Sequence, residues 1–373
     1  AVLRFMGRES GFRMVWGGPG VGKSALLARA VQVLQWPPGL REQTCPGLPD
    51  PGVRVSPLAY FVRRGQRTDD AGYMLDNLGQ RLEARRRTGV PLGGTVEERA
   101  RRLDERLKAV AGGLGEQERL LLIIDGLDEG AGAPGLLECL PRQLPPRVLV
   151  LFASREHPRV RDEVYGALVR GDAPREELNL GGLAPADVRA ILCESVDKYA
   201  LQPEYVDAVA AASGGNPHFL RLLCEGLLEG SFRLNNRVRL PKKMEELYDA
   251  TLKRFAAVGG TMDLLRLLAA ARDFLTPAAM AELLGRPVDE VRSALVPACA
   301  EVLFENPLTE LTEDYQLFHE SLGEYLRLKY PHELSAWEER LAVWCAAWPE
   351  RRGEMRAYAL RHGAAHLLDR RAA

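Results

Sequence analysis

The chain contains no apolar run that approaches the ~18 residues of a membrane-spanning helix. The layout of a signal peptide is also missing from its beginning. An excess of charge of one sign is absent as well, because 50 Lys and Arg residues balance 51 Asp and Glu residues. Without a global field, the charge balance gives no support to nucleic acid or a membrane as a partner. These absences predict a cytoplasmic protein that binds no membrane.

Closely spaced cysteine pairs are lacking too. The six cysteines include no C-x-x-C motif, so the spacing indicates neither a disulfide framework nor a zinc site of that kind. Several lie within apolar helical patterns, which predicts reduced residues of the core. The six are Cys45, Cys139, Cys193, Cys224, Cys299 and Cys345.

A glycine-rich turn near the N-terminus is the first informative feature. The spacing Gly17-x-x-x-x-Gly22-Lys23-Ser24 fits a phosphate-binding loop, in which glycines let backbone N–H groups converge on an anion. Lys23 would add a positive charge for the outer phosphates, Ser24 Oγ a ligand for Mg²⁺, and the following helix its N-terminal partial charge. The segment 12–16 can form the preceding strand. The expected phosphate contacts are Gly17, Gly18, Pro19, Gly20, Val21, Gly22, Lys23, Ser24 and Ala25.

The apolar run Leu120–Ile124 is the second feature, and it ends at Asp125. Consecutive apolar residues without alternation indicate a strand buried on both faces, as in a parallel sheet covered by helices. Ligands bind at the carboxyl ends of strands in such sheets, so we expect Asp125 to hold Mg²⁺ directly or through water. Asp128 and Glu129 follow in the turn, near enough to position an attacking water.

A further strand of the buried type, Val148–Ala153, ends in Ser154 and Arg155. The same rule places these two side chains beside the ligand. Arg155 could sense the γ-phosphate or pair with Glu156 at the surface, and we favour sensing. Because strand, helix and strand recur in this way, the sequence predicts an α/β P-loop NTPase core with a parallel sheet.

The sequence becomes predominantly helical from Pro185. Asn216 is suited to cap a helix N-terminus and Pro217 to occupy its first position. Further helices from about Leu240, followed by two short strands around an acidic turn, indicate a winged helix. We expect a nucleotide-binding domain over 1–183, an all-α lid over 184–238, a winged-helix domain over 239–330, and a helical tail over 331–373 that opens a repeat array.

Five segments together resemble a known family. The stretches "GGPGVGKSALL", "LLIIDGLDE", "LFASRE" and "GGNPHFL", and the histidine of "LFHESLGEYL", occur in the order of the STAND ATPases, most closely the NACHT branch. The resemblance implies a switch operated by ATP and ADP that hydrolyses ATP slowly. In this family a closed ADP-bound monomer opens on a trigger, exchanges to ATP and forms a homo-oligomer that activates a fused or associated effector. Sensor domains and a role in defence or cell-death signalling belong to the same implication.

The resemblance also assigns roles within the nucleotide-binding domain. Lys23 and Ser24 resemble the Walker A contacts to phosphate and Mg²⁺, and Asp125 resembles the Walker B metal ligand. Among the catalytic residues that the family implies, Glu129 is favoured as the carboxylate that activates water and Asp128 is the alternative.

Three further residues resemble family positions that report on the nucleotide. Arg155 resembles the sensor arginine after the fourth strand. Pro217 resembles the lid proline near the adenine, and His319 the winged-helix histidine that reaches the β-phosphate of ADP.

Two other functions fit part of the sequence. A winged helix could read DNA under ATP control. The candidate recognition helix over 287–299, however, carries Asp289 and Glu290 against Arg292, and the wing over 305–314 is acidic where phosphate contacts would need Lys or Arg. Nucleic acid is therefore not an expected partner. The other alternative is a nucleotide-binding scaffold that never hydrolyses, which the acidic residues after the Asp125 strand disfavour.

A pair of histidines in the tail has a spacing that occurs in metal sites. His362 and His366 stand at i and i+4 and could share a metal on one helical face, but no third ligand is visible. We expect them to be structural or solvent-facing.

Overall fold

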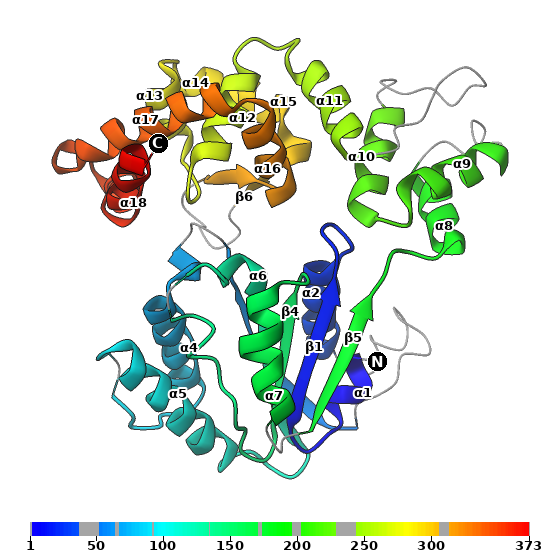
Figure 1. Cartoon of the computed structure of the whole chain (residues 1–373), viewed down its shortest axis with the longest axis vertical. Helices are drawn as coiled ribbons and strands as arrows, with labels where there is room; N and C mark the ends of the chain where they lie inside the picture. The colour runs from blue at the N-terminus through cyan, green and yellow to red at the C-terminus, as the bar shows by residue number, and fades with distance from the viewer. Residues whose placement is uncertain are drawn as a thin grey trace. The chain divides into compact units, whose positions relative to one another are not determined.

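The computed structural model describes residues 2–36, 52–63, 67–91, 93–133, 135–170, 174–195, 203–228, 244–305 and 313–372. The chain forms two compact units. The first comprises Ala1–Leu183 together with Asn216–His218, and the second comprises Ala184–Gly215 together with Phe219–Ala373. Figure 1 shows the course of the chain through both.

A parallel five-stranded sheet forms the centre of the first unit, in the order β2-β3-β4-β1-β5. The strand that precedes the glycine-rich turn, β1, is separated by β4 from β3, which carries Asp125. The carboxyl ends of β1, β3 and β4 therefore share one edge of the sheet. The strands are β1 Gly11–Gly17, β2 Arg54–Phe61, β3 Glu118–Asp125, β4 Val148–Ser154 and β5 Arg175–Leu180.

Helices cover both faces of this sheet. Alternate side chains of the strands point to opposite faces, so β3 sends Leu122 into one cluster and Ile123 into the other. The first cluster contains α4, α5, α6 and α7, and the second contains α1 and α2. These helices are α1 Val2–Met6, α2 Lys23–Gln35, α4 Ala71–Arg85, α5 Val96–Ala111, α6 Leu127–Gly130 and α7 Gly166–Arg170, with short turns of helix at Arg67–Asp69 and Val160–Tyr165.

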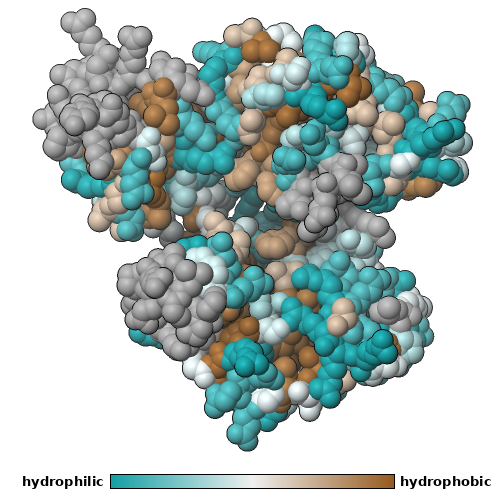
Figure 2. Space-filling model, turned by 180° about the vertical axis from the view of Figure 1, so that it is seen from behind, coloured by the Kyte–Doolittle hydropathy of each residue, from teal (hydrophilic) through white to brown (hydrophobic). Residues whose placement is uncertain are grey.

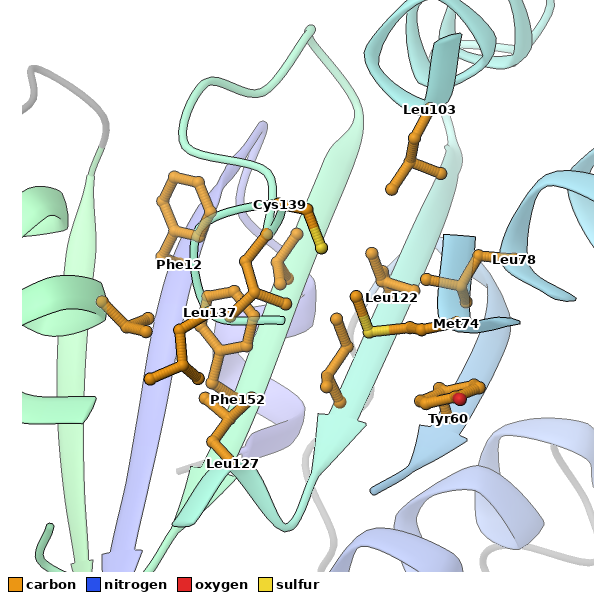
Figure 3. Packing of buried hydrophobic residues seen from close by; sticks show 14 of the residues in the cluster. Phe12, Tyr60, Met74, Leu78, Leu103, Leu122, Leu127, Leu137, Cys139 and Phe152 are labelled. Carbon is orange, nitrogen blue, oxygen red and sulfur yellow. The ribbon is translucent and has the colours of Figure 1, made fainter. Parts of the chain in front are cut away.

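Aromatic and aliphatic side chains fill the first cluster. The rings of Phe12 and Phe152, from neighbouring strands, stack with centroids 6.1 Å apart. Figure 3 shows them beside Leu127 and Leu137, with Met74 and Leu78 of α4 on the same face of the sheet, near Leu122 and Tyr60. The prediction of strands buried on both faces is confirmed for β3 and β4, whose apolar residues are fully buried.

The edge strand β5 has no counterpart among the predicted strands. Its residues alternate between exposed and half-buried positions, because only one edge of the strand is paired and few of its side chains reach the core. An apolar run of the kind that identifies β3 and β4 is therefore missing from it.

Helices dominate the second unit. A small antiparallel hairpin of β6 and β7 lies among them, and Leu275 bridges to Tyr315 at its side. The predicted fold class, a parallel-sheet core followed by helical and winged-helix parts, is confirmed. The elements are α8 Pro185–Ser195, α9 Pro203–Ser213, α10 Pro217–Leu228, α11 Met244–Phe255, α12 Thr261–Ala270, α13 Pro277–Leu284, α14 Val288–Glu290, α15 Val296–Ala298, β6 Leu303–Glu305, β7 Tyr315–Leu317, α16 Glu320–Lys329, α17 Pro331–Ala346 and α18 Gly353–Ala372, with short turns of helix at Val291–Leu295, Ala300–Val302 and Trp348–Glu350.

Parts of the predicted organisation fall outside the described residues. The predicted boundary between 238 and 239 does so, as do Cys45 and residues 306–312 of the acidic turn predicted over 305–314. Helix α10 begins in the first unit and continues into the second, because Asn216–His218 cluster with the sheet.

The histidines of the tail are structural, as predicted. Both lie on α18 and are buried. His362 Nε2 lies 3.2 Å from Asp273 Oδ2, and His366 Nε2 lies 3.1 Å from the Tyr358 hydroxyl. Among the described residues, no group of three or more His, Cys, Asp or Glu side chains could hold a metal ion.

The cysteines of the described residues carry free thiols. Four are buried, and burial raises the pKa of the Cys139 and Cys299 thiols to about 12, which keeps them protonated and inert. Cys193 departs from the prediction, because it lies on the exposed face of the amphipathic helix α8 rather than in the core.

None of the helices described is long and apolar enough to cross a membrane. On the face seen in Figure 2, hydrophilic residues are interspersed with hydrophobic ones.

Candidate functional site

The glycine-rich turn joins the end of β1 to the start of α2. Gly20 and Gly22 have φ values of 71° and 93°, a left-handed conformation that side chains with a Cβ rarely adopt. Gly22 is the N-cap of α2 and gives no side-chain cap. The first N–H groups of α2 therefore have no side-chain acceptor at the cap, which is the arrangement that binds an anion at a helix N-terminus.

Lys23 lies over the turn that precedes it. Its Nζ donates to the carbonyl oxygens of Gly17 at 2.8 Å and Gly18 at 3.0 Å. Burial lowers the pKa of the Lys23 ammonium, and the nearby carboxylates of Asp128 and Asp125 oppose that shift. A cation held in this way can turn toward a phosphate group that is bound by the loop.

Ser24 and Asp125 meet although 101 residues separate them in the sequence. The hydroxyl of Ser24 donates to Asp125 Oδ2. Asp125 is buried, and burial raises the pKa of its carboxyl group, while the bond from Ser24 and the charge of Lys23 work in the opposite direction. A hydroxyl and a carboxylate side by side are the oxygen donors that Mg²⁺ prefers.

Asp128 is held by the end of β4. Its Oδ1 accepts from the Arg155 backbone N–H at 2.8 Å and from Ser154 Oγ at 3.2 Å, and its Oδ2 lies 3.3 Å from Arg155 Nε. The predicted alternative partner of Arg155, Glu156, instead pairs with Arg161 at 3.5 Å. The carboxylate of Asp128 thus anchors the end of β4 and orients Arg155.

Glu129 occupies the second position of the acidic pair and is half-buried. Its backbone N–H donates to the carbonyl of Gly126, whose φ of 81° turns the chain sharply at the end of β3. Glu129 is near enough to Lys23 for its charge to act on the lysine pKa.

A segment from far along the sequence completes the surroundings of the loop. Asn216 Nδ2 donates to the Pro19 carbonyl at 3.0 Å, and the His218 N–H lies 3.4 Å from the Gly20 carbonyl. Pro217 Cγ lies 3.8 Å from where a Cβ on Gly22 would stand. The predicted cap is confirmed, because Asn216 Oδ1 accepts from the His218 N–H at 3.0 Å. The cap is readable from neighbouring residues, whereas the contact with the loop joins residues 197 positions apart and leaves no local signal.

His319 begins α16 in the second unit. Its Nδ1 accepts from the Ser321 N–H at 3.2 Å and lies 2.7 Å from Ser321 Oγ. Because Nδ1 is the acceptor, the neutral ring carries its proton on Nε2. The phosphate contact implied by the family resemblance stays a prediction, and Nε2 is the atom that would make it.

Comparisons with known proteins identify the fold. No protein-family model matches the chain, and no curated protein matches it. Among solved structures, a STAND protein with a tetratricopeptide repeat sensor from Pyrococcus horikoshii aligns with a TM-score of 0.59 at 17% identity, over 98% of this chain and 48% of that protein. The chain thus spans about half the length of this neighbour.

Two further structures align more loosely. The ORC1 protein of Aeropyrum pernix, in complex with DNA, gives a TM-score of 0.40 at 17% identity over 86% of this chain and 87% of that protein. A Walker-type ATPase of Pyrococcus abyssi gives 0.38 at 15% identity over 85% and 91%. The likeness to the Pyrococcus horikoshii protein shows a shared fold, and it does not distinguish the NACHT branch from other branches.

Proposed function

We propose that the protein binds ATP and ADP with Mg²⁺ and acts as a nucleotide-operated switch. The observation that carries the proposal is the meeting of three separate segments at one sheet edge: the glycine-rich loop, the Ser24–Asp125 pair and the β4 end ordered by Asp128. A fold likeness alone does not assign a function. The chemistry of these donors does point to a magnesium-bound phosphate chain.

The residues present fit such a ligand. The loop from Gly17 to Gly22 and the start of α2, through Ala25, would offer backbone N–H groups to the phosphates, and Lys23 would exchange its loop carbonyls for phosphate oxygens. Ser24 and Asp125 would hold Mg²⁺, which supplies charge neutralisation between the outer phosphates. Pro217 would approach the adenine, as the family resemblance implies.

For hydrolysis we assign the acceptor of the water proton to Glu129. Its neighbour Asp128 already accepts from Ser154 and from the Arg155 backbone and pairs with the Arg155 side chain, so it has a structural role at the end of β4. Arg155 would respond to the γ-phosphate from the position that Asp128 gives it. A scaffold that binds nucleotide without hydrolysing it is the alternative, and a single-turnover assay with ATP separates the two.

The wider role follows the family resemblance and the likeness to the Pyrococcus horikoshii protein, which is a signal transduction ATPase with a repeat sensor. We propose that the chain works in the cytoplasm, that the ATP state forms homo-oligomers, and that sensor and effector domains, fused or associated, supply the trigger and the output in defence or cell-death signalling. The contact of His319 with the β-phosphate of ADP would hold the closed state.

Nucleic acid is not part of this proposal. The single arginine of the candidate recognition helix, Arg292, pairs with Glu313 at 2.9 Å, so its charge is already matched within the protein. The neighbouring Asp289 and Glu290 would repel a phosphate backbone. The DNA in the ORC1 structure is a property of that protein.

Replacing Lys23 tests the proposal directly. The variant Lys23→Ala should lose ATP and ADP binding in titration calorimetry with Mg²⁺, because the loop then has no mobile cation for the outer phosphates. Lys108→Ala on the exposed side of α5 removes an equal charge away from the site and should bind as the wild type does. Near-normal ATP affinity in Lys23→Ala would refute the site.

A further inference from the structure

Both polar atoms of the Asn216 side-chain amide make hydrogen bonds. Its Oδ1 accepts from the His218 N–H and caps α10, while its Nδ2 donates to the Pro19 carbonyl 197 residues earlier in the chain. The next carbonyl of the loop, that of Gly20, lies 3.4 Å from the same His218 N–H. Two successive carbonyls of the glycine-rich loop are thus engaged by the beginning of α10.

These two hydrogen bonds to carbonyl groups also orient the N–H groups of the same peptide units. A trans peptide unit is planar, and its C=O and N–H groups point in opposite directions. The described chain contains no cis peptide bonds. Holding the Pro19 carbonyl therefore orients the Gly20 N–H, and holding the Gly20 carbonyl orients the Val21 N–H. Both N–H groups belong to the loop that would surround the phosphates.

The fit between Asn216 and the loop is close. A Cβ placed on Gly20 would lie 2.9 Å from Asn216 Oδ1 and 3.1 Å from its Nδ2, so only glycine leaves room for the amide. An ordered turn presents Asn216 to the loop: Gly214 and Gly215 have φ values of 54° and 74°, and the Gly215 N–H donates to Ser213 Oγ at 3.2 Å.

We propose that Asn216 is a positioning residue for the nucleotide, which orients the loop N–H groups toward the phosphates and ties the shape of the loop to the first turn of α10. This inference rests on the proposed nucleotide binding. It adds a specific coupling: when phosphate fixes the loop, the His218 N–H is held more firmly, and when the nucleotide leaves, the start of α10 loosens.

Two variants test the Nδ2 donor of Asn216 separately from its role as the N-cap of α10. Asn216→Asp keeps an oxygen that caps α10 but has no N–H for the Pro19 carbonyl, and Asn216→Ser caps equally without adding charge. The serine side chain ends one bond short of the Nδ2 position, so it leaves the loop carbonyl without its partner. Asn77→Asp on α4 repeats the amide-to-acid change away from the loop and serves as the control.

The measurement is ADP release by stopped-flow with a fluorescent ADP, combined with hydrogen exchange of the His218 amide. Both Asn216 variants should release ADP roughly two- to tenfold faster, the effect of one hydrogen bond. Both should also lose the protection of the His218 amide that ADP gives to the wild type and to Asn77→Asp. Release and protection equal to the wild type in Asn216→Ser would overturn the inference. If the wild type itself binds no nucleotide, the proposed function fails instead.

Discussion

Asp128 and Glu129 are adjacent carboxylates with different surroundings. Asp128 is buried and is engaged by Ser154 and Arg155, whereas Glu129 is half-buried and follows on the next position of a short helix. Asp128 is therefore committed to the end of β4, which supports the proposal that Glu129 accepts the proton of the attacking water.

Exchanging each carboxylate for its amide tests this division. Glu129→Gln should keep ATP bound and slow hydrolysis about 10²–10⁴-fold, because an amide holds a water but cannot accept its proton. Asp128→Asn should have the smaller effect on single-turnover hydrolysis and a lower melting temperature, since Arg155 loses its charged partner. A block of turnover in Asp128→Asn with normal turnover in Glu129→Gln would reverse the assignment.

Burial and the neighbouring charge of Lys23 act on the pKa of Asp125 in opposite directions. Burial raises the pKa of its carboxyl group above the ordinary value, more than the Ser24 bond and the Lys23 charge lower it. A carboxyl group whose pKa is higher in the folded than in the unfolded state stabilises the fold in its protonated form. That stabilisation is lost as pH rises through the folded pKa. The binding site is thus less stable at neutral pH than the same fold with a neutral side chain.

Asp125→Asn should therefore melt at a higher temperature than the wild type at pH 8 without nucleotide. The difference should shrink as the pH falls through the folded pKa, and it should vanish below about 3, where Asp125 is protonated in both states of the wild type. With Mg²⁺ and ADP the order should reverse, because only the wild type retains the metal ligand. Differential scanning calorimetry across this pH range measures both effects, and a lower melting temperature for Asp125→Asn at every pH contradicts the argument.

Helix α16 begins with a histidine in place of the usual short polar cap. His319 caps the helix through Nδ1, which leaves the proton of the neutral ring on Nε2. A single residue thus fixes the start of an element and presents an N–H donor. Capping and phosphate binding are compatible on this ring because they use different nitrogens.

The two roles of His319 can be separated. His319→Asn retains a capping side chain but removes Nε2, whereas His319→Ala removes both. If the ring couples the winged helix to ADP, both variants should release ADP faster, by five- to 150-fold for a coupling of ~1–3 kcal/mol, and both should self-associate in light scattering. Wild-type release and a wild-type monomer in His319→Asn, with a change only in His319→Ala, would limit the residue to capping.

The division into two units is a property of the chain as a whole. Each unit has its own set of internal packing contacts, and the glycine-rich loop with its acidic partners belongs to the first. Ligand binding stabilises only the folded unit that contains the site. The loop–α10 contact of Asn216 also lies within the first unit.

We therefore expect bound nucleotide to stabilise the first unit against unfolding more than the second. In urea the chain should unfold in two transitions, and ADP with Mg²⁺ at 100 times Kd should stabilise one of them by about 2.7 kcal/mol. Trp16, buried in β1, reports on the first unit, and Trp344, buried in α17, reports on the second. Lys23→Ala is the control, and its unfolding transitions should not shift when ADP and Mg²⁺ are added. An equal shift of both probes would show that the units unfold together.

The sequence by itself determined the features that depend on neighbouring residues. The spacing from Gly17 to Ser24 is local, and the positive φ values of Gly20 and Gly22 are those that such a turn requires. The apolar runs of β3 and β4 are continuous because both faces of these strands are buried, so their ends at Asp125 and Ser154 could be located. The cap of α10 at Asn216 was equally readable.

Tertiary structure alone decided the rest. The half-exposed edge strand β5 has too few core side chains to show a pattern, and the exposure of Cys193 depends on which face of α8 meets the core. The contact of Asp128 with the backbone of Arg155 joins residues 27 positions apart, so the fold and not the local sequence brings this carboxylate to the end of β4. The contact of Asn216 with Pro19 joins residues 197 positions apart, and no local pattern encodes it because packing brings them together.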